Sequence, residues 1–281
     1  MSQEPLVSVD HSVGDPGQPA PRINTAVAHN ARIWDYWLGG KDNYQVDREV
    51  GERIREMVPH IDAVARADRR FLSRAVRYLA GQVGIRQFLD IGTGLPTADN
   101  THQVAQAIAP ESRIVYVDND PLVLVHARAL LNSSPDGVTD YIEADVRDPD
   151  TILTQAAQAL NFDEPIAVML LGVLNFVQDT GQVQAIVDRL LDAVPSGSYL
   201  ALTHPTTELG GEGNVEAMAY YNQHATPKIC ARSGAEIARL VHRLELVEPG
   251  LVSCSLWRAA ADENGGQPVR VPQYGVVGRK P

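Results

Sequence analysis

The sequence has few cysteines, and they lack the spacing that disulfide or zinc sites need. Its 281 residues contain only Cys230 and Cys254, without a CxxC pair or a neighbouring pair of histidines. A disulfide framework or a structural zinc site requires more thiols, at closer and more regular spacings. We therefore expect both cysteines to be small buried apolar side chains, and we expect no metal.

Long apolar and basic runs are absent as well. The longest apolar stretch extends from Ile166 to Leu174, whereas a membrane-spanning helix needs about 20 residues. No run of Lys or Arg could follow a phosphate backbone, and the formal net charge of −11 disfavours both nucleic acid and an anionic membrane surface. The composition thus indicates a protein that binds neither of them.

The first residues lack the features of a secretory signal. Residues 1–21 are rich in Pro, Gly, Gln and Asp, with no basic start followed by an apolar stretch. They are predicted to form a flexible tail. Because signal and membrane span are both missing from the pattern, we expect a cytoplasmic protein. The sequence does not indicate its oligomeric state.

The segment after the tail shows helical periodicity. Apolar residues recur at three- and four-residue steps, which predicts helices over residues 25–38, 45–57 and 60–80. Gly39 and Gly40 end the first of these helices, and Pro59 follows the second. Residues 22–84 are therefore expected to form a helical N-terminal lid, followed by one domain over 85–281.

From residue 85 onward, short apolar runs alternate with amphipathic helices, which is typical of a parallel sheet built from βαβ units. Strands are predicted over residues 87–91, 113–118, 139–144, 166–171 and 198–203, with helices over 97–109, 121–131, 149–160 and 181–193. A helical insertion is expected at about 206–232, then a helix over 233–243 with Ser233 as its N-cap. Short strands are predicted over 244–247 and 251–258, and a last strand over 274–278 that pairs antiparallel. These elements predict a Rossmann-like α/β fold.

A glycine loop follows the first strand of this domain. Asp90, Gly92 and Gly94 form a D-x-G-x-G pattern, in which glycines let backbone N–H groups approach a ligand closely. A dinucleotide fingerprint would have a third glycine at Thr97, and Pro96 removes an N–H that a pyrophosphate would use. The carboxylate of Asp90 suits the ammonium and sulfonium of S-adenosylmethionine better than NAD. The same glycines would also fit a simple strand-to-helix turn.

Acidic residues also end the next two strands. Asp118, with Asn119 beside it, lies 24 residues beyond Gly94, where an acid accepts hydrogen bonds from ribose hydroxyls. Either Asp118 or Asp120 could instead cap the helix expected after them, and we expect Asp120 to cap and Asp118 to bind ribose.

Asp145 follows the third strand. Its carboxylate could accept the adenine amine while the Val146 backbone contacts the ring edge. Alone, Asp145 would be interpreted as a solvated loop acid, so its assignment depends on Asp90 and Asp118.

The ends of the fourth and fifth strands offer weaker candidates. The segment from Leu171 to Phe176, which includes Gly172 as a cofactor-flanking residue, lacks the Asn/Asp-Pro-Pro-aromatic motif common in amino-methyltransferases that act on DNA bases. Asn175 either orients a polar group or has its amide satisfied by backbone, and we favour the second. His204 is the candidate general base because a histidine pKa lies near neutrality, although a structural histidine is the default.

The most unusual stretch extends from Trp34 to Tyr44 and combines aromatic residues, a glycine pair and a dense polar set. It is either an amphipathic helix with core aromatics or a lid over the ligand. In the lid hypothesis, Tyr36 and Tyr44 exclude water, Lys41 or Arg32 neutralises a carboxylate, and Asn43 belongs to the same polar set.

Four motifs together resemble one bacterial family. They are Trp34 to Tyr44, Phe88 to Gly94, Val117 to Pro121 and Tyr274 to Lys280. The family was first described as a domain of unknown function and was later named S-adenosyl methyltransferase, and the resemblance covers about residues 22–281.

The resemblance implies a class I methyltransferase fold, a seven-stranded sheet with an antiparallel last strand and S-adenosylmethionine at the strand tips. It places Asp90, Gly92 and Gly94 at the methionine end, Asp118 at the ribose and Asp145 at the adenine.

The resulting hypothesis is a methyltransferase in which a nucleophile attacks the sulfonium methyl of S-adenosylmethionine. A small-molecule acceptor is expected because a helical lid would exclude a bulky polymer. The alternative is a non-catalytic module that senses S-adenosylmethionine, because no residue is an evident base. An NAD-linked oxidoreductase ranks third, since Pro96 and Thr97 disfavour it.

Overall fold

The computed structural model describes residues 24–96, 99–120, 122–123, 133–260 and 268–281. The expected tail, the start of the helix expected over 97–109 and nearly all of the helix expected over 121–131 lie outside these residues.

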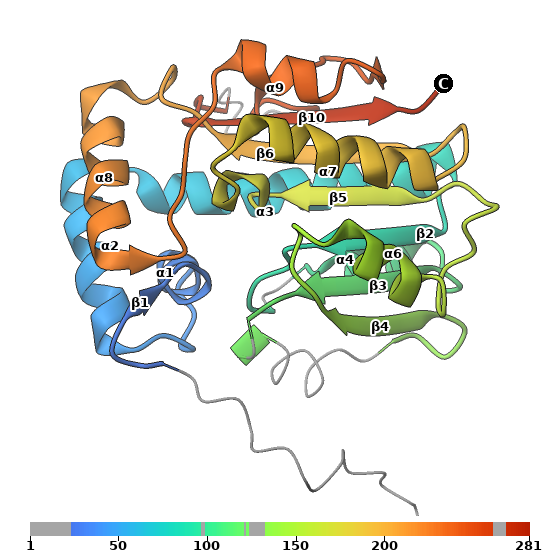
Figure 1. Cartoon of the computed structure of the whole chain (residues 1–281), viewed down its shortest axis with the longest axis horizontal. Coiled ribbons are helices and arrows are strands. Elements are labelled where there is room, and N and C mark those ends of the chain that lie inside the picture. Colours follow the sequence, from blue (N-terminus) through green and yellow to red (C-terminus); the bar gives the residue numbers. More distant parts are fainter. Residues whose placement is uncertain (1–23, 97–98, 121, 124–132, 261–267) are drawn as a thin grey trace, which may run out of the picture.

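A mostly parallel sheet forms the middle layer of the molecule (Figure 1). The parallel strands are β2 (Gln87–Ile91), β3 (Arg113–Asp118), β4 (Val138–Glu143), β5 (Ala167–Leu171) and β6 (Tyr199–Pro205). They lie in the order β4-β3-β2-β5-β6, so the chain moves outward from β2 in one direction and then returns to continue in the other. Such a reversal leaves a crevice at the carboxyl ends of the two central strands, β2 and β5.

The last strand completes the expected pattern. β10 (Gln273–Arg279) pairs antiparallel with β6, from Gln273 opposite Pro205 to Arg279 opposite Tyr199. Two short strands, β8 (Glu245–Leu246) and β9 (Val252–Ser253), also pair with β10, which makes eight strands in the described part of this sheet. The Rossmann-like class with an antiparallel last strand is thus confirmed, and the described sheet has one strand more than the seven that the family resemblance implied.

Both faces of the sheet are covered by helices. Alternate residues of a strand point to opposite faces, and Phe88 and Ile114 accordingly join one hydrophobic cluster while Leu89 and Val115 join another. The first cluster includes α3 (Ile61–Arg77) and α4 (Thr101–Ile108). The second includes α6 (Pro149–Ala156), α7 (Thr180–Ala193) and α9 (Gly234–Leu240). Burial on both faces explains the continuous apolar runs Ile114–Val117 in β3 and Ala167–Leu171 in β5.

Three helices that cover the sheet begin at side chains that accept their free N–H groups. Ser233 accepts a hydrogen bond from the Glu236 N–H and caps α9, as expected from the sequence. Asp148 and Asp179 cap α6 and α7 in the same way.

A further group of helices lies at the carboxyl ends of the parallel strands (Figure 1). It comprises α1 (Asn30–Trp37), α2 (Gln45–Met57) and α8 (Gly211–His224). The helix expected over 25–38 begins only at Asn30, because β1 (Ala28–His29) pairs with β7 (Ala225–Thr226) inside the expected insertion. The helix expected over 60–80 ends at Arg77, and the π-helix η1 (Tyr78–Val83) continues it. The N-terminal helices and the insertion therefore meet beside the crevice.

No helix in the described residues is long and apolar enough to cross a membrane. Cys254 is buried and Cys230 is half-buried, and both are free thiols.

Candidate functional site

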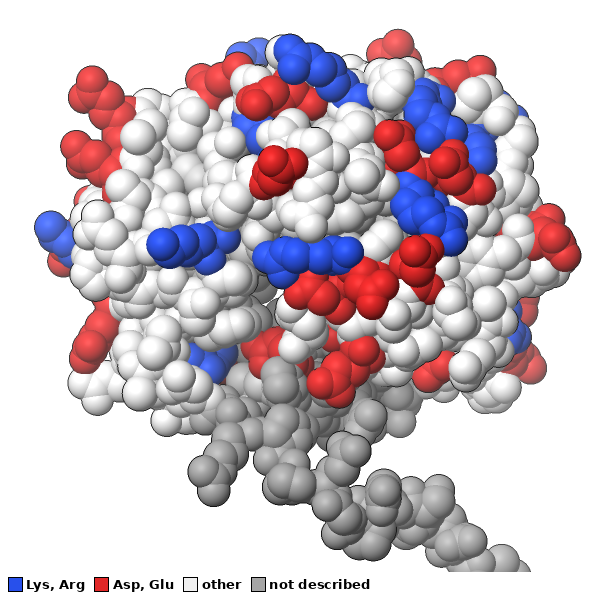
Figure 2. All heavy atoms as spheres, viewed as in Figure 1, with Lys and Arg blue, Asp and Glu red and all other residues white. Residues whose placement is uncertain are grey.

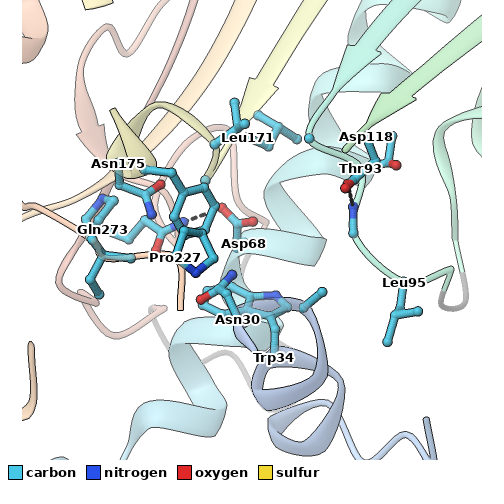
Figure 3. Close-up of a pocket in the computed structure, with 18 of the residues that line it drawn as sticks. Asn30, Trp34, Asp68, Thr93, Leu95, Asp118, Leu171, Asn175, Pro227 and Gln273 are labelled. Carbon is cyan, nitrogen blue, oxygen red and sulfur yellow. Dashed lines mark hydrogen bonds between the residues drawn. The ribbon is translucent and has the colours of Figure 1, made fainter. Parts of the chain in front are cut away.

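A cavity of about 240 Å³ lies at the carboxyl ends of the strands. The tips of β2 and β3 and the segments that follow β4 and β5 line one side of it, and residues of α1, α2, α3 and α8 line the other. The cavity therefore occupies the place where open α/β sheets bind their ligands. Figure 3 shows Thr93 and Asp118 on one side of this space and Asp68 and Asn175 on the other.

Asp90, the second-last residue of β2, is a buried carboxylate within the cavity lining. Its Oδ2 accepts a hydrogen bond of 2.6 Å from the Thr101 hydroxyl. Burial raises the pKa of Asp90 to about 6, and the Thr101 hydrogen bond and the charge of Arg69 oppose only part of this shift. A carboxylate that is costly to ionise gains most from a cationic ligand, so Asp90 is suited to an ammonium group.

The loop after β2 depends on its glycines. A Cβ on Gly92 would lie 2.4 Å from the Val173 side chain, so only glycine lets this loop pack against the segment after β5. Gly94 has a φ of +64°, which L residues rarely adopt, and its N–H donates to Asp118 Oδ2 at 2.8 Å. The glycine pair therefore joins the tips of β2, β3 and β5.

Asp118 ends β3 with both carboxylate oxygens hydrogen-bonded to backbone. Oδ2 accepts from Gly94, and Oδ1 accepts from the Asp120 N–H at 2.9 Å. Each carboxylate oxygen has two lone pairs, so these bonds leave acceptor capacity for the hydroxyls of a ribose. Burial raises the pKa of Asp118, and the two backbone hydrogen bonds oppose the rise.

Asp120 accepts a hydrogen bond of 2.9 Å from the Leu122 N–H, as expected for a capping residue. Its Oδ2 also lies 3.0 Å from Nδ1 of His29, which directly precedes α1. Burial raises the pKa of Asp120, but the hydrogen bond and charge of His29, the Leu122 hydrogen bond and the Arg32 charge together leave this pKa below its usual value. This pair connects the N-terminal helices to the tip of β3.

Asp145 and Val146 follow β4 and line the cavity together with Asn119. Asn119 Nδ2 and the Arg147 guanidinium both donate to Asp145 Oδ2, each at 2.8 Å. The Arg147 N–H donates to the other carboxylate oxygen at 2.8 Å. Asp145 is therefore held in position by hydrogen bonds and is not a freely solvated loop acid. Gly172, after β5, completes the expected set in the cavity lining.

The four residues expected to form the lid are placed differently: Tyr36, Lys41, Asn43 and Tyr44 do not line the cavity. The ring of Tyr36 lies under the Arg55 guanidinium of α2, 4.9 Å from ring centroid to Cζ, and its hydroxyl bonds to Glu52.

The other three residues lie at the start of α2, in the solvent or against α1. Tyr44 is the N-cap of α2, and Lys41 is exposed. Asn43 donates to Asp35 Oδ2 at 2.7 Å. Arg32, the other cation considered for a ligand carboxylate, instead pairs with the buried Asp47 at 2.8 Å.

The same segment contributes other side chains to the cavity. Trp34, Asp35 and Leu38 line it. Residues three and four apart share one face of a helix, whereas Tyr36 lies two positions from Trp34 and points away. The helical phase of α1 thus decides which aromatic residues line the cavity, namely Trp34 and Trp37 but not Tyr36.

Comparisons with known proteins identify the family of this site. The sequence profile described as S-adenosyl methyltransferase matches residues 16–281. The chain belongs to this family. A DUF574 family protein from Streptomyces avermitilis is 43% identical, with 92% of this chain and 100% of that one covered and a TM-score of 0.88. A protein from Thermobifida fusca, described as a methyltransferase candidate, is 38% identical over 90% and 95% of the two chains, with a TM-score of 0.81. No curated protein matches the chain.

Family membership confirms the resemblance drawn from the four motifs. It also confirms the methyltransferase class and S-adenosylmethionine as the cofactor expected for it.

In this member of the S-adenosyl methyltransferase family, the surroundings of His204 do not suit a general base. It is 0% exposed and does not line the cavity. An Arg232 guanidinium nitrogen lies 2.8 Å from Nε2, and the Pro205 carbonyl oxygen lies 2.9 Å from Nδ1. Since arginine can only donate, Nε2 accepts and the proton resides on Nδ1. Burial, reinforced by the Arg232 charge, lowers the pKa of His204 to about 4. These contacts fit the default expectation that His204 is a structural histidine. They do not fit the role of a general base.

Asp68 of α3 and Gln273 of β10 line the cavity, although the sequence analysis did not single them out. Gln273 Nε2 donates to Asp68 Oδ1 at 2.6 Å. The sequence does contain an indication of Asp68. It is an acid on the apolar face of α3, which includes Val64, Phe71 and Leu72.

Asn175 also lines the cavity, and its side-chain Oδ1 is buried without a hydrogen-bond partner in the described residues. The expectation that backbone would satisfy this amide is therefore wrong for its oxygen.

Proposed function

We propose that this protein transfers a methyl group from S-adenosylmethionine to a small-molecule acceptor inside the cavity. One observation carries the proposal: Asp90, Asp118 and Asp145 converge with the glycine loop on one cavity at the switch point of the sheet. Acids at three strand tips can recognise the ammonium, ribose and adenine of one nucleoside ligand.

The charge of the lining supports this ligand over a dinucleotide. Among the described residues, the carboxylates of the lining are Asp35, Asp68, Asp90, Asp118 and Asp145, against the two guanidinium groups of Arg69 and Arg147. A pyrophosphate would meet like charges here, whereas an ammonium and a sulfonium would meet opposite ones. The site therefore fits S-adenosylmethionine.

The proposed roles follow the order of the strands. Asp90 holds the ammonium at the methionine end, beside Gly92 and Gly94. Asp118, with Asn119, accepts the ribose hydroxyls. Asp145 accepts the adenine amine, and Val146 contacts the edge of the adenine ring. Gly172 flanks the cofactor. When bound, the cofactor supplies an electrophilic methyl on sulfur, and the protein contributes mainly approach and orientation.

A small acceptor is favoured by the helices beside the cavity. Helices α1, α2, α3 and α8 all contribute to its lining opposite the strand tips, and these walls disfavour a bulky polymer. On the face shown in Figure 2, basic and acidic side chains are interspersed without a continuous basic area. This face therefore gives no electrostatic path for a nucleic acid.

Isothermal titration tests the cofactor assignment. S-adenosylmethionine and S-adenosylhomocysteine are expected to bind, and NAD is not; tight binding of NAD would overturn the assignment. A screen for S-adenosylhomocysteine release over a metabolite panel then tests turnover. Binding without turnover on any acceptor would favour the non-catalytic sensor instead.

A further inference from the structure

The half of the cavity away from Asp118 contains a second polar cluster, which we name the acceptor lobe. It consists of Asp68, Asn175 and Gln273, with Trp34, Met218 and Ile229 as its apolar wall. Figure 3 shows Asp68, Asn175 and Gln273 close to one another and above Trp34. These side chains belong to α1, α3, α8, β10, the short 3-10 helix η2 (Leu174–Phe176) and the loop after β7, so none of them belongs to β2, β3 or the segment after β4, whose acids are assigned to the cofactor.

Asn175 gives the first indication of a ligand in this lobe. The residue is only 6% exposed, and its Oδ1 is buried without a hydrogen-bond partner in the described part of the chain. A buried carbonyl oxygen that has lost water and gained no donor is costly, so native proteins rarely keep one without a reason. A donor on a bound ligand would supply the missing hydrogen bond.

Asp68 gives the second indication. It is 7% exposed, and Gln273 Nε2 donates to its Oδ1 at 2.6 Å while also lying 3.3 Å from the Thr203 hydroxyl. Burial raises the pKa of Asp68, and the Thr203 and Gln273 hydrogen bonds and the Arg69 charge oppose the rise. A buried carboxylate of this kind gains from a cation and can also hold a proton.

The two groups together restrict the chemistry of the acceptor. The Asn175 oxygen and an ionised Asp68 both accept hydrogen bonds, so a complementary ligand presents at least two donors on one group. A hydroxyl offers one donor and an ammonium offers three. A ligand carboxylate or phosphate would be repelled by the aspartates of the lining, whereas Trp34, Met218 and Ile229 suit an apolar body.

We propose that the methyl acceptor is a small amine on an apolar body, and that Asn175 and Asp68 bind its ammonium group. The proposal rests on the proposed function. In the proton step, one N–H bond of the ammonium breaks and the proton passes to the Asp68 carboxylate. The electron pair of that bond stays on nitrogen, which becomes a neutral nucleophile. Gln273 is a positioning residue, because it holds Asp68 by a hydrogen bond and needs no contact with the amine.

Ligand-binding measurements on the full chain test this proposal without relying on turnover. The protein is first titrated with S-adenosylhomocysteine and then, at saturation, with tryptamine and 2-phenylethylamine. The matched alcohols, tryptophol and 2-phenylethanol, and the matched acid, 3-phenylpropanoic acid, serve as comparison probes. Each amine is expected to bind about tenfold more tightly than its alcohol, and the acid is expected to bind weakest.

Two variants locate the binding groups. Asp68→Asn keeps an oxygen for Gln273 but removes the charge, and Asn175→Leu removes the orphan oxygen at similar size. Both are expected to weaken amine binding about tenfold while S-adenosylhomocysteine affinity, which also reports a native fold, stays unchanged. Asn175→Asp should retain amine binding. The exposed loop residue Asp163 provides the matched control Asp163→Asn, which should change neither affinity.

The outcomes separate the two proposals. If S-adenosylhomocysteine does not bind the unmodified protein, the proposed function fails. If it binds but the amines bind no more tightly than their alcohols, the amine assignment fails by itself, and this comparison remains decisive even if a variant does not fold. Loss of S-adenosylhomocysteine binding in a folded Asp68→Asn protein would overturn the acceptor role and place Asp68 in the cofactor site.

Discussion

The backbone N–H of Gly94 donates a hydrogen bond of 2.8 Å to Asp118 Oδ2 and so joins the loop after β2 to the tip of β3. The bond holds the two elements that would contact opposite ends of the cofactor. It also fixes the orientation of the Asp118 carboxylate before a ligand arrives, which lowers the entropy cost of binding.

Replacing Asp118 is expected to weaken cofactor binding. Asp118→Ala removes the acceptor proposed for the ribose hydroxyls, at a cost of about 1–3 kcal/mol, which corresponds to roughly a 5- to 150-fold higher Kd. Titration with S-adenosylhomocysteine measures the change, and Asp163→Ala on the surface is the control. Unchanged affinity in a folded Asp118→Ala protein would refute the ribose role.

Asp90 is expected to lower the stability of the ligand-free protein at neutral pH. Its pKa is raised from 3.8 to about 6 in the fold. The folded state therefore binds this proton more tightly than the unfolded state does. The resulting gain in the free energy of unfolding is fully present below about pH 4 and is lost as the pH rises through about 6. The difference between the two pKa values corresponds to about 3 kcal/mol in the free energy of unfolding.

Urea unfolding checks this expectation. Asp90→Asn should be more stable than the unmodified protein at pH 7.5, by up to about 3 kcal/mol, and nearly equal to it at pH 4. The same variant should bind S-adenosylhomocysteine more weakly. A variant that is less stable at both pH values would contradict the assignment of the raised pKa to Asp90.

The two loop glycines should respond differently to alanine. At Gly92 a Cβ would lie 2.4 Å from Val173, so Gly92→Ala requires movement of the segment after β5. At Gly94 a Cβ meets nothing within 4 Å, and only the φ of +64° is unfavourable, at about 1–2 kcal/mol. Thermal unfolding should therefore show a larger loss for Gly92→Ala, and equal losses would argue against the packing explanation.

His204 is expected to contribute to stability and not to proton transfer. His204→Ala leaves the buried Arg232 guanidinium without its Nε2 acceptor, at a cost of about 1–3 kcal/mol. S-adenosylhomocysteine affinity should change little, because His204 does not line the cavity. Once an acceptor is known, the pH profile of turnover should have the same shape in the variant. Loss of the acidic limb, on which protonation of a general base lowers the rate, would restore the role of His204 as a base.

Much of the fold could be predicted from local patterns. The strand predicted over 87–91 corresponds to β2 (Gln87–Ile91), and the helix predicted over 45–57 corresponds to α2 (Gln45–Met57). Elements whose limits depend on distant partners were predicted less well. The first helix begins late because residues 28 and 29 pair with β7, nearly 200 residues further along the chain.

The sequence by itself determined the polar groups at the strand tips. Asp90, Gly94 and Asp118 were identified because each lies at a fixed distance from a strand end, and parallel strands bring their carboxyl ends to one edge. Only the tertiary structure decided the acceptor lobe, in which Asp68 accepts a hydrogen bond from Gln273, 205 residues further along the chain. It also decided that Trp34, and not Tyr36, faces the cavity. Both depend on how helices pack on the sheet, and packing is set by the whole core rather than by any local spacing.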